Sequence, residues 1–387
     1  MADIPQLGIA GRIAAAFAES KLTPLFIGAA LLLGAFSIWQ TPREEEPQIV
    51  VPMLDVMVQM PGASAEEVEQ RVTIPMEQLI REIPGVEYVY SNSHPALSML
   101  IVRFYVGTPE EDAIVQTYNK LYANLDRIPP GVSQPIVKAR SINDVPILAL
   151  TLWGKGYEGY RLRQIAAELQ LSLKEMDDIS EVQIIGGEPR QVRVVLNPNR
   201  LAGYALTPAE VVDRLQHANN RAASGSFGNR NEQFQVEAGR FLGSATELAR
   251  VVVAVRAGRP IFLGDVAEIL DGPAEPDTYV LFATAAGGGN AARGEFPAVT
   301  LTLAKRKGAN ATQIAEAVEQ KVEQLRGYLL PADLNTTLTR NYGATARDKS
   351  DELLEHLLLA TLSVALLVAL ALGWRESGVV LLAVPVT

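Results

Sequence analysis

Two uncharged apolar stretches, residues 22–39 and 357–374, frame a long region in which polar and apolar positions alternate. Each stretch is long enough to cross a bilayer, because a helix rises about 1.5 Å per residue and the hydrocarbon core is about 30 Å thick. We therefore expect two membrane helices with residues 43–355 outside the membrane. A third apolar run, 377–387, follows the short loop Arg375-Glu376 and has about half the length of a span, so it predicts the truncated start of a third membrane helix.

Charges beside the first stretch predict the orientation of the chain. Arg12 and Lys21 precede the stretch, and the rule that basic residues stay inside places the N-terminus in the cytoplasm. Residues 1–21 also carry a modest amphipathic pattern that is typical of a segment on the membrane surface. The alternative is a cleaved signal peptide, but the apolar run exceeds a typical signal core and no clean cleavage site follows it.

Helix starts are marked by Ser, Thr or Asn followed three residues later by Glu or Gln, because such pairs satisfy free backbone donors reciprocally. Four such starts predict helices at 64–82, 108–126, 207–219 and 310–328. Pro109 and Pro208 occupy what we expect to be the first helical position of two of them. Apolar residues at helical spacing predict a fifth helix at 161–176.

Short alternating or β-branched runs bounded by Gly and Pro predict the strands. The predicted strands are 50–59, 86–91, 97–106, 134–138, 147–153, 182–185, 192–196, 298–303 and 335–339. Residues 50–138 thus follow the order strand, helix, strand, strand, helix, strand of a ferredoxin-like sandwich. The same order recurs when 147–185 is combined with 298–339, which predicts a second sandwich interrupted by an insertion at about 188–278.

The insertion is predicted to hold short strands at 250–255 and 260–262 and a polar, glycine-punctuated stretch at 221–239. That stretch is too polar to build a core, so it is either a loop or an arm that packs on another subunit. Taken alone, the pattern favours the loop.

Composition excludes several functional classes. Apolar residues make up 48% of the chain and charged residues 20%, which is typical of folded domains. The net charge of −10, with both signs interspersed, leaves no basic face for nucleic acid, and the absence of cysteine excludes disulfides and thiol chemistry. Glu44 to Glu46 are interpreted as a solvated linker, and Met53, Met57 and Met60 as packing residues on the two faces of a strand. We found no pattern for a metal site, a cofactor or an enzyme's catalytic group.

Several motifs resemble one known family. They are residues 42–49, Pro52, the Pro-Gly-Ala-Ser of 61–64, the Ile-Pro-Gly-Val of 83–86, the Leu-Asn-Pro of 196–198 and the Leu-Thr-Pro of 206–208. In this order they resemble resistance-nodulation-division (RND) efflux pumps, closest to the exporters of hydrophobic and amphiphilic compounds. The resemblance extends from about residue 22 to 385.

The resemblance implies a membrane protein with an α+β periplasmic region. That region would contain two ferredoxin-like βαββαβ porter subdomains, the second interrupted by a docking subdomain, and membrane helices would flank it. The implied parts are a cytoplasmic amphipathic segment 1–21, membrane helix 22–42, porter subdomain 43–140, a second porter subdomain 141–187 with 279–345, docking subdomain 188–278, membrane helix 355–375 and the start of a third membrane helix at 377–387.

Members of this family are proton-driven homotrimers of the bacterial inner membrane that act with a periplasmic adaptor protein and an outer-membrane channel. The resemblance therefore implies trimeric alternating-access export of small hydrophobic or amphiphilic substrates, without a cofactor, in contact with membrane lipid. Neither full span contains an ionisable residue, and such residues mark proton pathways in membranes. The resemblance itself implies that the family's proton relay, on later membrane helices, would lie beyond Thr387. The open alternatives are heavy-metal RND efflux and a two-span periplasmic binding or assembly module that transports nothing.

The predicted helix 108–126 resembles the family's central pore helix. Glu111, Val115, Asn119 and Tyr122 follow one another at spacings of four, four and three, so they share one helical face that could meet its symmetry mates in a trimer. The alternative is an ordinary amphipathic helix with a solvated side.

Two further sets of site residues are implied by the resemblance alone. Ile147, or Pro146 if the alignment shifts by one residue, and Ile185 stand where multidrug members carry aromatic pocket residues; the alternative is that both are core isoleucines. The polar stretch becomes an arm that contacts the neighbouring subunit, which reverses the preference for a loop. Its candidate contact residues are Arg221, Asn229, Arg230, Gln233 and Gln235.

Overall fold

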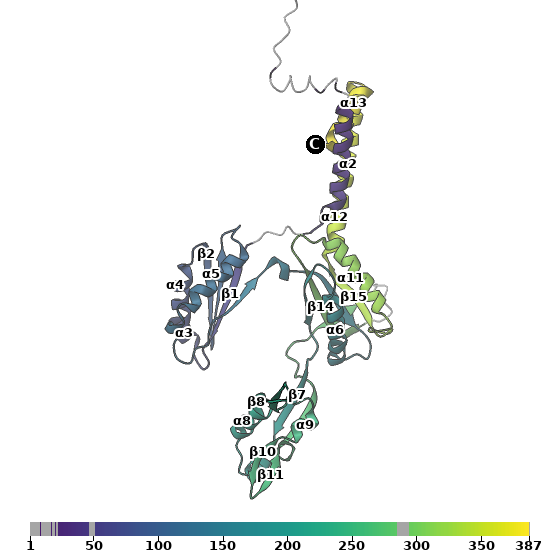
Figure 1. The fold of residues 1–387 in the computed structure, drawn as a ribbon. Coiled ribbons are helices and arrows are strands. Elements are labelled where there is room, and N and C mark those ends of the chain that lie inside the picture. The colour runs from purple at the N-terminus through teal and green to yellow at the C-terminus, as the bar shows by residue number, and fades with distance from the viewer. Residues whose placement is uncertain are drawn as a thin grey trace, which may run out of the picture. The chain divides into compact units, whose positions relative to one another are not determined.

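The computed structural model describes residues 22–45, 51–284 and 294–386, together with Gly8, Phe17 and Ser20 (Figure 1). The expected amphipathic segment 1–21 thus lies, apart from these three residues, outside the described part of the chain. By its contacts the chain divides into two compact units. The first unit holds residues up to 151, 168–184 and 301–387, and the second holds 152–167 and 185–300.

A four-stranded antiparallel sheet in the order β2-β3-β1-β4 organises the first part of the chain. Its elements are β1 (Met53–Gln59), α3 (Ala65–Val68), η1 (Glu69–Thr73), α4 (Ile74–Arg81), β2 (Val86–His94), β3 (Leu97–Phe104), α5 (Glu110–Tyr122), η2 (Leu125–Arg127) and β4 (Ile136–Arg140). Strand order along the chain matches the expected strand, helix, strand, strand, helix, strand.

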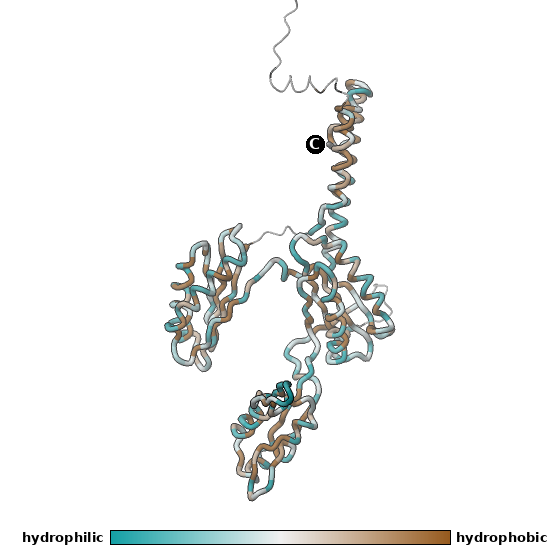
Figure 2. Tube along the Cα trace, in the orientation of Figure 1, coloured by the Kyte–Doolittle hydropathy of each residue, from teal (hydrophilic) through white to brown (hydrophobic). Residues whose placement is uncertain are grey.

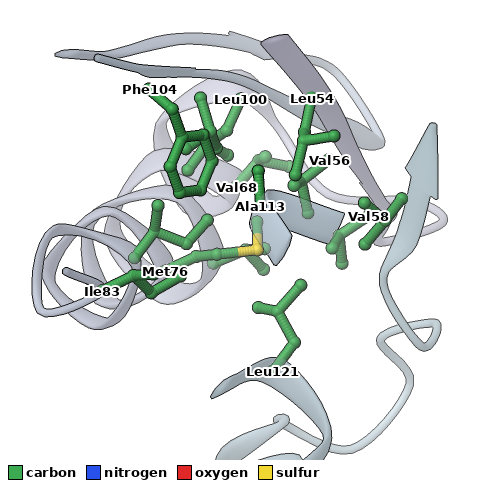
Figure 3. Close-up of a cluster of buried hydrophobic side chains, with 14 of the residues drawn as sticks. Leu54, Val56, Val58, Val68, Met76, Ile83, Leu100, Phe104, Ala113 and Leu121 are labelled. Atoms are coloured by element: carbon green, nitrogen blue, oxygen red, sulfur yellow. The ribbon is translucent and has the colours of Figure 1, made fainter. Parts of the chain in front are cut away.

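The core of this part lies between one face of the sheet and its helices. Leu54, Val56 and Val58 alternate along β1 toward this core, and Leu100, Val102 and Phe104 do the same along β3, as period-2 patterning requires. Figure 3 labels five of these side chains, Leu54, Val56, Val58, Leu100 and Phe104, and shows them facing residues of the helical layer. The helices contribute Val68, Val72, Met76, Ile80, Ala113 and Leu121.

The helix predicted at 64–82 is one helical run with a π turn inside it. Ser64 and Glu67 form the expected capping box. The run then widens at η1, where the Ile74 N–H donates to the carbonyl of Glu69, five residues back. The next residue is Pro75, which cannot donate a backbone hydrogen bond.

The cap predicted at Thr108 is wrong. The N-cap of α5 is Pro109, which is extended and makes no side-chain cap, so the helix begins at Glu110. Three acidic residues, Glu110, Glu111 and Asp112, occupy its first turn, where negative charge complements the helix dipole.

A five-stranded sheet joins segments far apart in the chain, in the order β13-β14-β5-β15, with β6 also paired to β14. Its strands are β5 (Pro146–Trp153), β6 (Ile179–Ile185), β13 (Leu281–Thr284), β14 (Gly294–Lys305) and β15 (Asn335–Asn341), with η3 (Ile142–Asp144) and the helices α6 (Gly159–Lys174) and α11 (Ala311–Leu325) in the same segments. The sequence missed β13. Trp153 is 1% exposed and stacks on Phe282 of that strand at 4.5 Å between ring centroids.

Residues 190–273 form a separate small core around Leu201, Val211, Val253, Leu263 and Val266. Strands β7 and β12 pair antiparallel, as do β10 with β11 and β8 with β9. The elements are β7 (Arg190–Leu196), α7 (Pro198–Gly203), α8 (Pro208–Ala218), β8 (Arg221–Asn229), β9 (Glu232–Gly239), α9 (Ala245–Ala249), β10 (Val252–Arg256), β11 (Arg259–Phe262), α10 (Leu263–Val266) and β12 (Ala267–Pro273). The capping box of Thr207 and Glu210, with Pro208 at the first helical position, is confirmed.

Three apolar helices are in contact through the last of them: α13 (Trp374–Val386) packs against α12 (Tyr342–Ala371) and against α2 (Thr23–Gln40). Figure 1 shows them in one column. Figure 2 shows long stretches of apolar colour along these helices, whereas the two colours alternate along most of the remaining trace. Two of them, α2 and α12, are long and apolar enough to cross a membrane, with mean hydropathies of 1.5 and 2.2 over windows that are 0% and 11% buried. A core helix of a soluble protein would instead be mostly buried.

Two boundaries in this bundle differ from expectation. Helix α12 begins at Tyr342, so a polar segment, 342–356, runs without a break into the apolar part. Arg375 and Glu376, expected in a loop, lie in the first turn of α13, because the chain turns earlier, at Gly373, where φ is +121°.

Candidate functional site

Helix α5 presents the four residues that spacing placed on one face. Glu111, Val115, Asn119 and Tyr122 are all exposed, with Val115 at 55% and Tyr122 at 52%. The opposite side is buried through Ala113, Thr117 and Leu121. The helix is therefore packed on one side and carries an apolar valine and a tyrosine on its free side.

The free face of the first sheet is a surface that the sequence analysis missed. Residues on alternate positions of its strands point away from the helices, and they are mainly apolar, aromatic or long-chain. They are Met53, Asp55 and Met57 of β1, Tyr88 and Tyr90 of β2, Met99, Ile101 and Arg103 of β3, and Ile136, Lys138 and Arg140 of β4. The alternation in 53–59 could have indicated two faces, but not which of them the helices leave open.

Aromatic and polarisable groups lie close together on this open face. Tyr88 and Tyr90 are about half exposed and stack with ring centroids 6.0 Å apart. The Arg103 guanidinium lies 5.7 Å from the Tyr88 ring centroid, and Met57 pairs directly with Met99 across β1 and β3. Such side chains adapt to apolar and cationic ligands alike.

One carboxylate interrupts the apolar character of the open face. Asp55 is 9% exposed; its Oδ2 accepts a 2.6 Å hydrogen bond from Arg140 Nε, while its Oδ1 has no hydrogen-bond partner. A buried carboxylate oxygen without a donor costs free energy, and a ligand N–H or O–H would supply one.

The structure gives the two candidate pocket isoleucines different environments. Ile147 on β5 is 7% exposed, whereas Ile185 at the end of β6 is 46% exposed. The interpretation of both as core residues is therefore wrong for Ile185. This residue ends β6, where fewer neighbouring side chains cover it than cover the middle of the strand. The two residues belong to different compact units.

The polar stretch 221–239 forms a β-hairpin, so the stand-alone preference for a loop is wrong. Strands β8 and β9 pair from Arg221 with Gly239 to Asn229 with Glu232. The two-residue turn, Arg230 and Asn231, has φ values of +49° and +65°, which match the right-handed twist of a hairpin. Arg221 forms an ion pair with Glu237, and the Gln233 amide donates to the Ser226 hydroxyl at 3.0 Å.

Every residue of the two hairpin strands is exposed. Phe227 and Phe234 stack on each other, with ring centroids 5.3 Å apart, and remain 56% and 43% exposed. The base of the hairpin is fixed: Leu242 N–H donates to Asn219 Oδ1 at 2.9 Å, and a Cβ on Gly239 would collide with the Asn220 carbonyl. The hairpin is therefore fixed at its base and carries a stacked, exposed pair of phenylalanine rings.

The linker after α2 is held rather than solvated, which corrects the interpretation of Glu44. Its Oε1 lies 2.8 Å from Nζ of Lys305, whose side chain is 5% exposed. Arg43 pairs with Asp351 of α12 at 2.8 Å, and its carbonyl accepts from the Ala311 N–H at 3.2 Å. The exit of α2 is thus attached to β14, α11 and α12.

Electrostatics elsewhere follow local hydrogen bonds. Backbone and side-chain hydrogen bonds from Ser64 hold the pKa of Glu67 below its ordinary value, and Thr207 does the same for Glu210. Among the described residues, no group of three or more His, Asp or Glu side chains is arranged to hold a metal ion.

Comparison with known proteins places the chain. The model of the AcrB/AcrD/AcrF family matches residues 17–387. The multidrug resistance protein MdtC of Salmonella schwarzengrund is 27% identical over 380 residues, which are 97% of this chain and 36% of that protein. The MdtC of Citrobacter koseri is 26% identical over 377 residues, with coverages of 96% and 36%.

The chain belongs to the AcrB/AcrD/AcrF family of RND permeases. It spans about 36% of the length of the curated relatives that it matches.

Proposed function

We propose that this chain is part of an inner-membrane RND permease that exports hydrophobic or amphiphilic compounds. The observation that carries the proposal is the family match over residues 17–387, together with relatives named for multidrug resistance. In this proposal α2 and α12 cross the inner membrane, and the sheets between them lie in the periplasm.

The sheets fit a pair of porter subdomains. We assign the ferredoxin-like sandwich to residues 43–140 and a second one to 141–187 with 279–345, with a docking subdomain at 188–278. In support, the first sheet has the order β2-β3-β1-β4 with two helical segments on one face. Strands β5, β6, β14 and β15, drawn from both sides of the docking segment, share one sheet.

Substrates would contact surfaces that these subdomains leave open. The exposed Ile185 and the open face with Tyr88, Tyr90 and Met57 offer apolar area, worth about 25 cal/mol per Å² buried. Aliphatic walls lack aromatic stacking, worth about 0.5–1.5 kcal/mol per pair, so aromatic substrates would depend on the tyrosines. Ile147, the other pocket residue that the resemblance implies, is 7% exposed.

The remaining site residues serve trimer assembly in this proposal. The free face of α5, with Glu111, Val115, Asn119 and Tyr122, would line a central pore among three copies. The hairpin β8–β9 would reach the neighbouring subunit. In support, all residues of its two strands are exposed, and the stacked rings of Phe227 and Phe234 remain about half exposed. Asn229, Arg230, Gln233 and Gln235 would supply hydrogen bonds there, while Arg221 holds the ribbon.

In this proposal proton flow supplies the energy, and residues 22–42 and 357–374 offer no ionisable side chain to carry it. A periplasmic adaptor and an outer-membrane channel would complete the export path. We assign no catalytic chemistry and no cofactor to the chain.

Deletion of the gene in its own bacterium tests the proposal. The deletion strain should accumulate more of a fluorescent amphiphile and become sensitive to bile salts and cationic dyes, and the intact gene should restore export. Sensitivity to zinc or copper alone would instead indicate heavy-metal efflux. Unchanged accumulation of every compound would contradict transport and favour a periplasmic binding or assembly role.

A further inference from the structure

A cleft on the helical side of the first sheet has no role in the proposed transport path. It has a volume of 180 Å³ and lies between α4, the end of α5 and the loop 128–135. Val58, Val72, Met76 and Leu121 form its buried walls, and Figure 3 shows three of them, Val58, Met76 and Leu121, around one space. A cavity of about 150 Å³ is enough for a benzene ring.

The outer wall of the cleft is preformed. Ser133 N–H donates to the Gln59 carbonyl at 2.8 Å, and Gln59 N–H donates to the Ser133 hydroxyl at 2.9 Å. These two bonds fasten the loop that carries Ile128, Pro129 and Val132 to the end of β1. A ligand would therefore meet a formed site and would not have to order the loop.

Charge at the mouth is unbalanced. Arg71 and Arg127 line the cleft, and neither forms an ion pair with a carboxylate in the described part of the chain. Among the described residues that line the cleft, Glu82 is the only acidic one, and it is paired with Lys120. The hydrogen bond and charge of Lys120 hold the pKa of Glu82 below its ordinary value, so Glu82 stays ionised and engaged. Arg127 acts on Glu82, and Arg71 on Glu67, only through charge at longer range, so both guanidinium groups keep their N–H donors for an anion.

The π turn η1 places one of these guanidinium groups. Arg71 and Val72 both belong to Glu69–Thr73, the widened turn of the helix. Such turns are rare and are found frequently at functional sites. Because of this turn, the guanidinium group of Arg71 and the apolar side chain of Val72 line the same cleft although the two residues are adjacent in sequence.

We propose that this cleft binds a small amphiphilic anion, with a ring-sized apolar body among Val58, Met76 and Leu121 and a carboxylate or similar head group between Arg71 and Arg127. The site lies on the opposite side of the sheet from the open face, so it is a second ligand site that does not depend on the transport proposal.

Because the chain has no cysteine, a single introduced thiol can report on the cleft. We choose Gln78→Cys, at an exposed position in the lining, and Gln70→Cys, exposed nearby but outside the lining, as the matched control. The rate of maleimide labelling is measured on the full chain in detergent with benzoate, benzyl alcohol or benzamidinium as probes at millimolar concentration.

Benzoate should slow labelling at position 78 several-fold, benzyl alcohol less and benzamidinium least, with no effect at position 70. Adding Arg71→Gln and Arg127→Gln should raise the benzoate concentration for half-protection by about tenfold or more, because a hydrogen bond to a charged group is lost at each site. Arg81→Gln, exposed on α4 outside the lining, should change nothing. Equal protection by the cation, equal protection at both thiols, or no effect of the two substitutions would overturn the proposal.

Discussion

The ion pair between Glu44 and Lys305 gives a sharp test of how the first apolar helix, α2, is attached to the strand β14. The side chains are 20% and 5% exposed, and Nζ and Oε1 lie 2.8 Å apart. At an effective dielectric constant of about 20, the gross attraction at this distance is about 6 kcal/mol, from which the desolvation of both ions subtracts several. Removing one partner of a buried pair costs about 3–5 kcal/mol, because the other charge is left without compensation.

The burial of the two side chains makes the expected costs unequal. Glu44→Gln leaves the nearly inaccessible ammonium of Lys305 unpaired, so it should reach that full cost. Lys305→Met leaves a carboxylate that is more exposed and can reach water, so it should cost less. The double variant should be more stable than Glu44→Gln alone, because no unpaired charge remains.

Hydrogen exchange of the Ala311 amide reports this attachment, because that N–H donates to the carbonyl of Arg43 next to Glu44. A loss of about 3 kcal/mol corresponds to exchange on the order of 100-fold faster in Glu44→Gln. Glu45→Gln, exposed and adjacent, is the matched control and should leave the rate unchanged. Equal rates in the two single variants, or faster exchange in the double variant than in Glu44→Gln, would refute the reasoning.

Three further outcomes follow from packing and capping. Gly343→Val should lower the free energy of unfolding, measured by urea denaturation, by about 1–3 kcal/mol, because a Cβ at this position would lie 2.5 Å from the Ala311 carbonyl oxygen. An unchanged free energy of unfolding would contradict this close approach of α11 and α12. Leu100→Ala, fully buried, should cost about 2–5 kcal/mol by the same assay, and a loss under about 1 kcal/mol would argue against the core in Figure 3. The hydrogen bonds from Ser64 hold the pKa of Glu67 below its ordinary value, so the cap contributes stability above the ordinary pKa that is lost as the pH falls through the lower folded pKa. A Glu67→Gln variant should lose less helical signal in this acid range, and identical acid profiles would contradict the cap.

Local signals predicted part of the fold well. The caps at Ser64 and Thr207 are confirmed because each needs only four consecutive residues. The same signal failed at Thr108, because Pro109 adopts an extended conformation and postpones the helix by one residue. The order of helices and strands in residues 50–140 followed from these cap signals together with the alternating strand runs.

Features set by distant residues could not be predicted. Glu44 and Lys305 are 261 residues apart, so no local pattern indicated their pairing. The hairpin at 221–239 lacks the alternation of a half-buried sheet because all its strand residues are exposed, and its Arg-Asn turn lacks the glycine of common two-residue turns. The open face of the first sheet depends on which side the helices cover, which is a tertiary property.

The location of the region between the two apolar helices tests the central claim most directly. In the cysteine-free chain, Asn229→Cys at the hairpin tip and Glu376→Cys at the start of α13 would be treated with a charged maleimide that does not cross the inner membrane. The account predicts labelling of position 229 in intact cells and labelling of position 376 only after the inner membrane is permeabilised. Labelling of position 376 but not 229 in intact cells would contradict a periplasmic porter region.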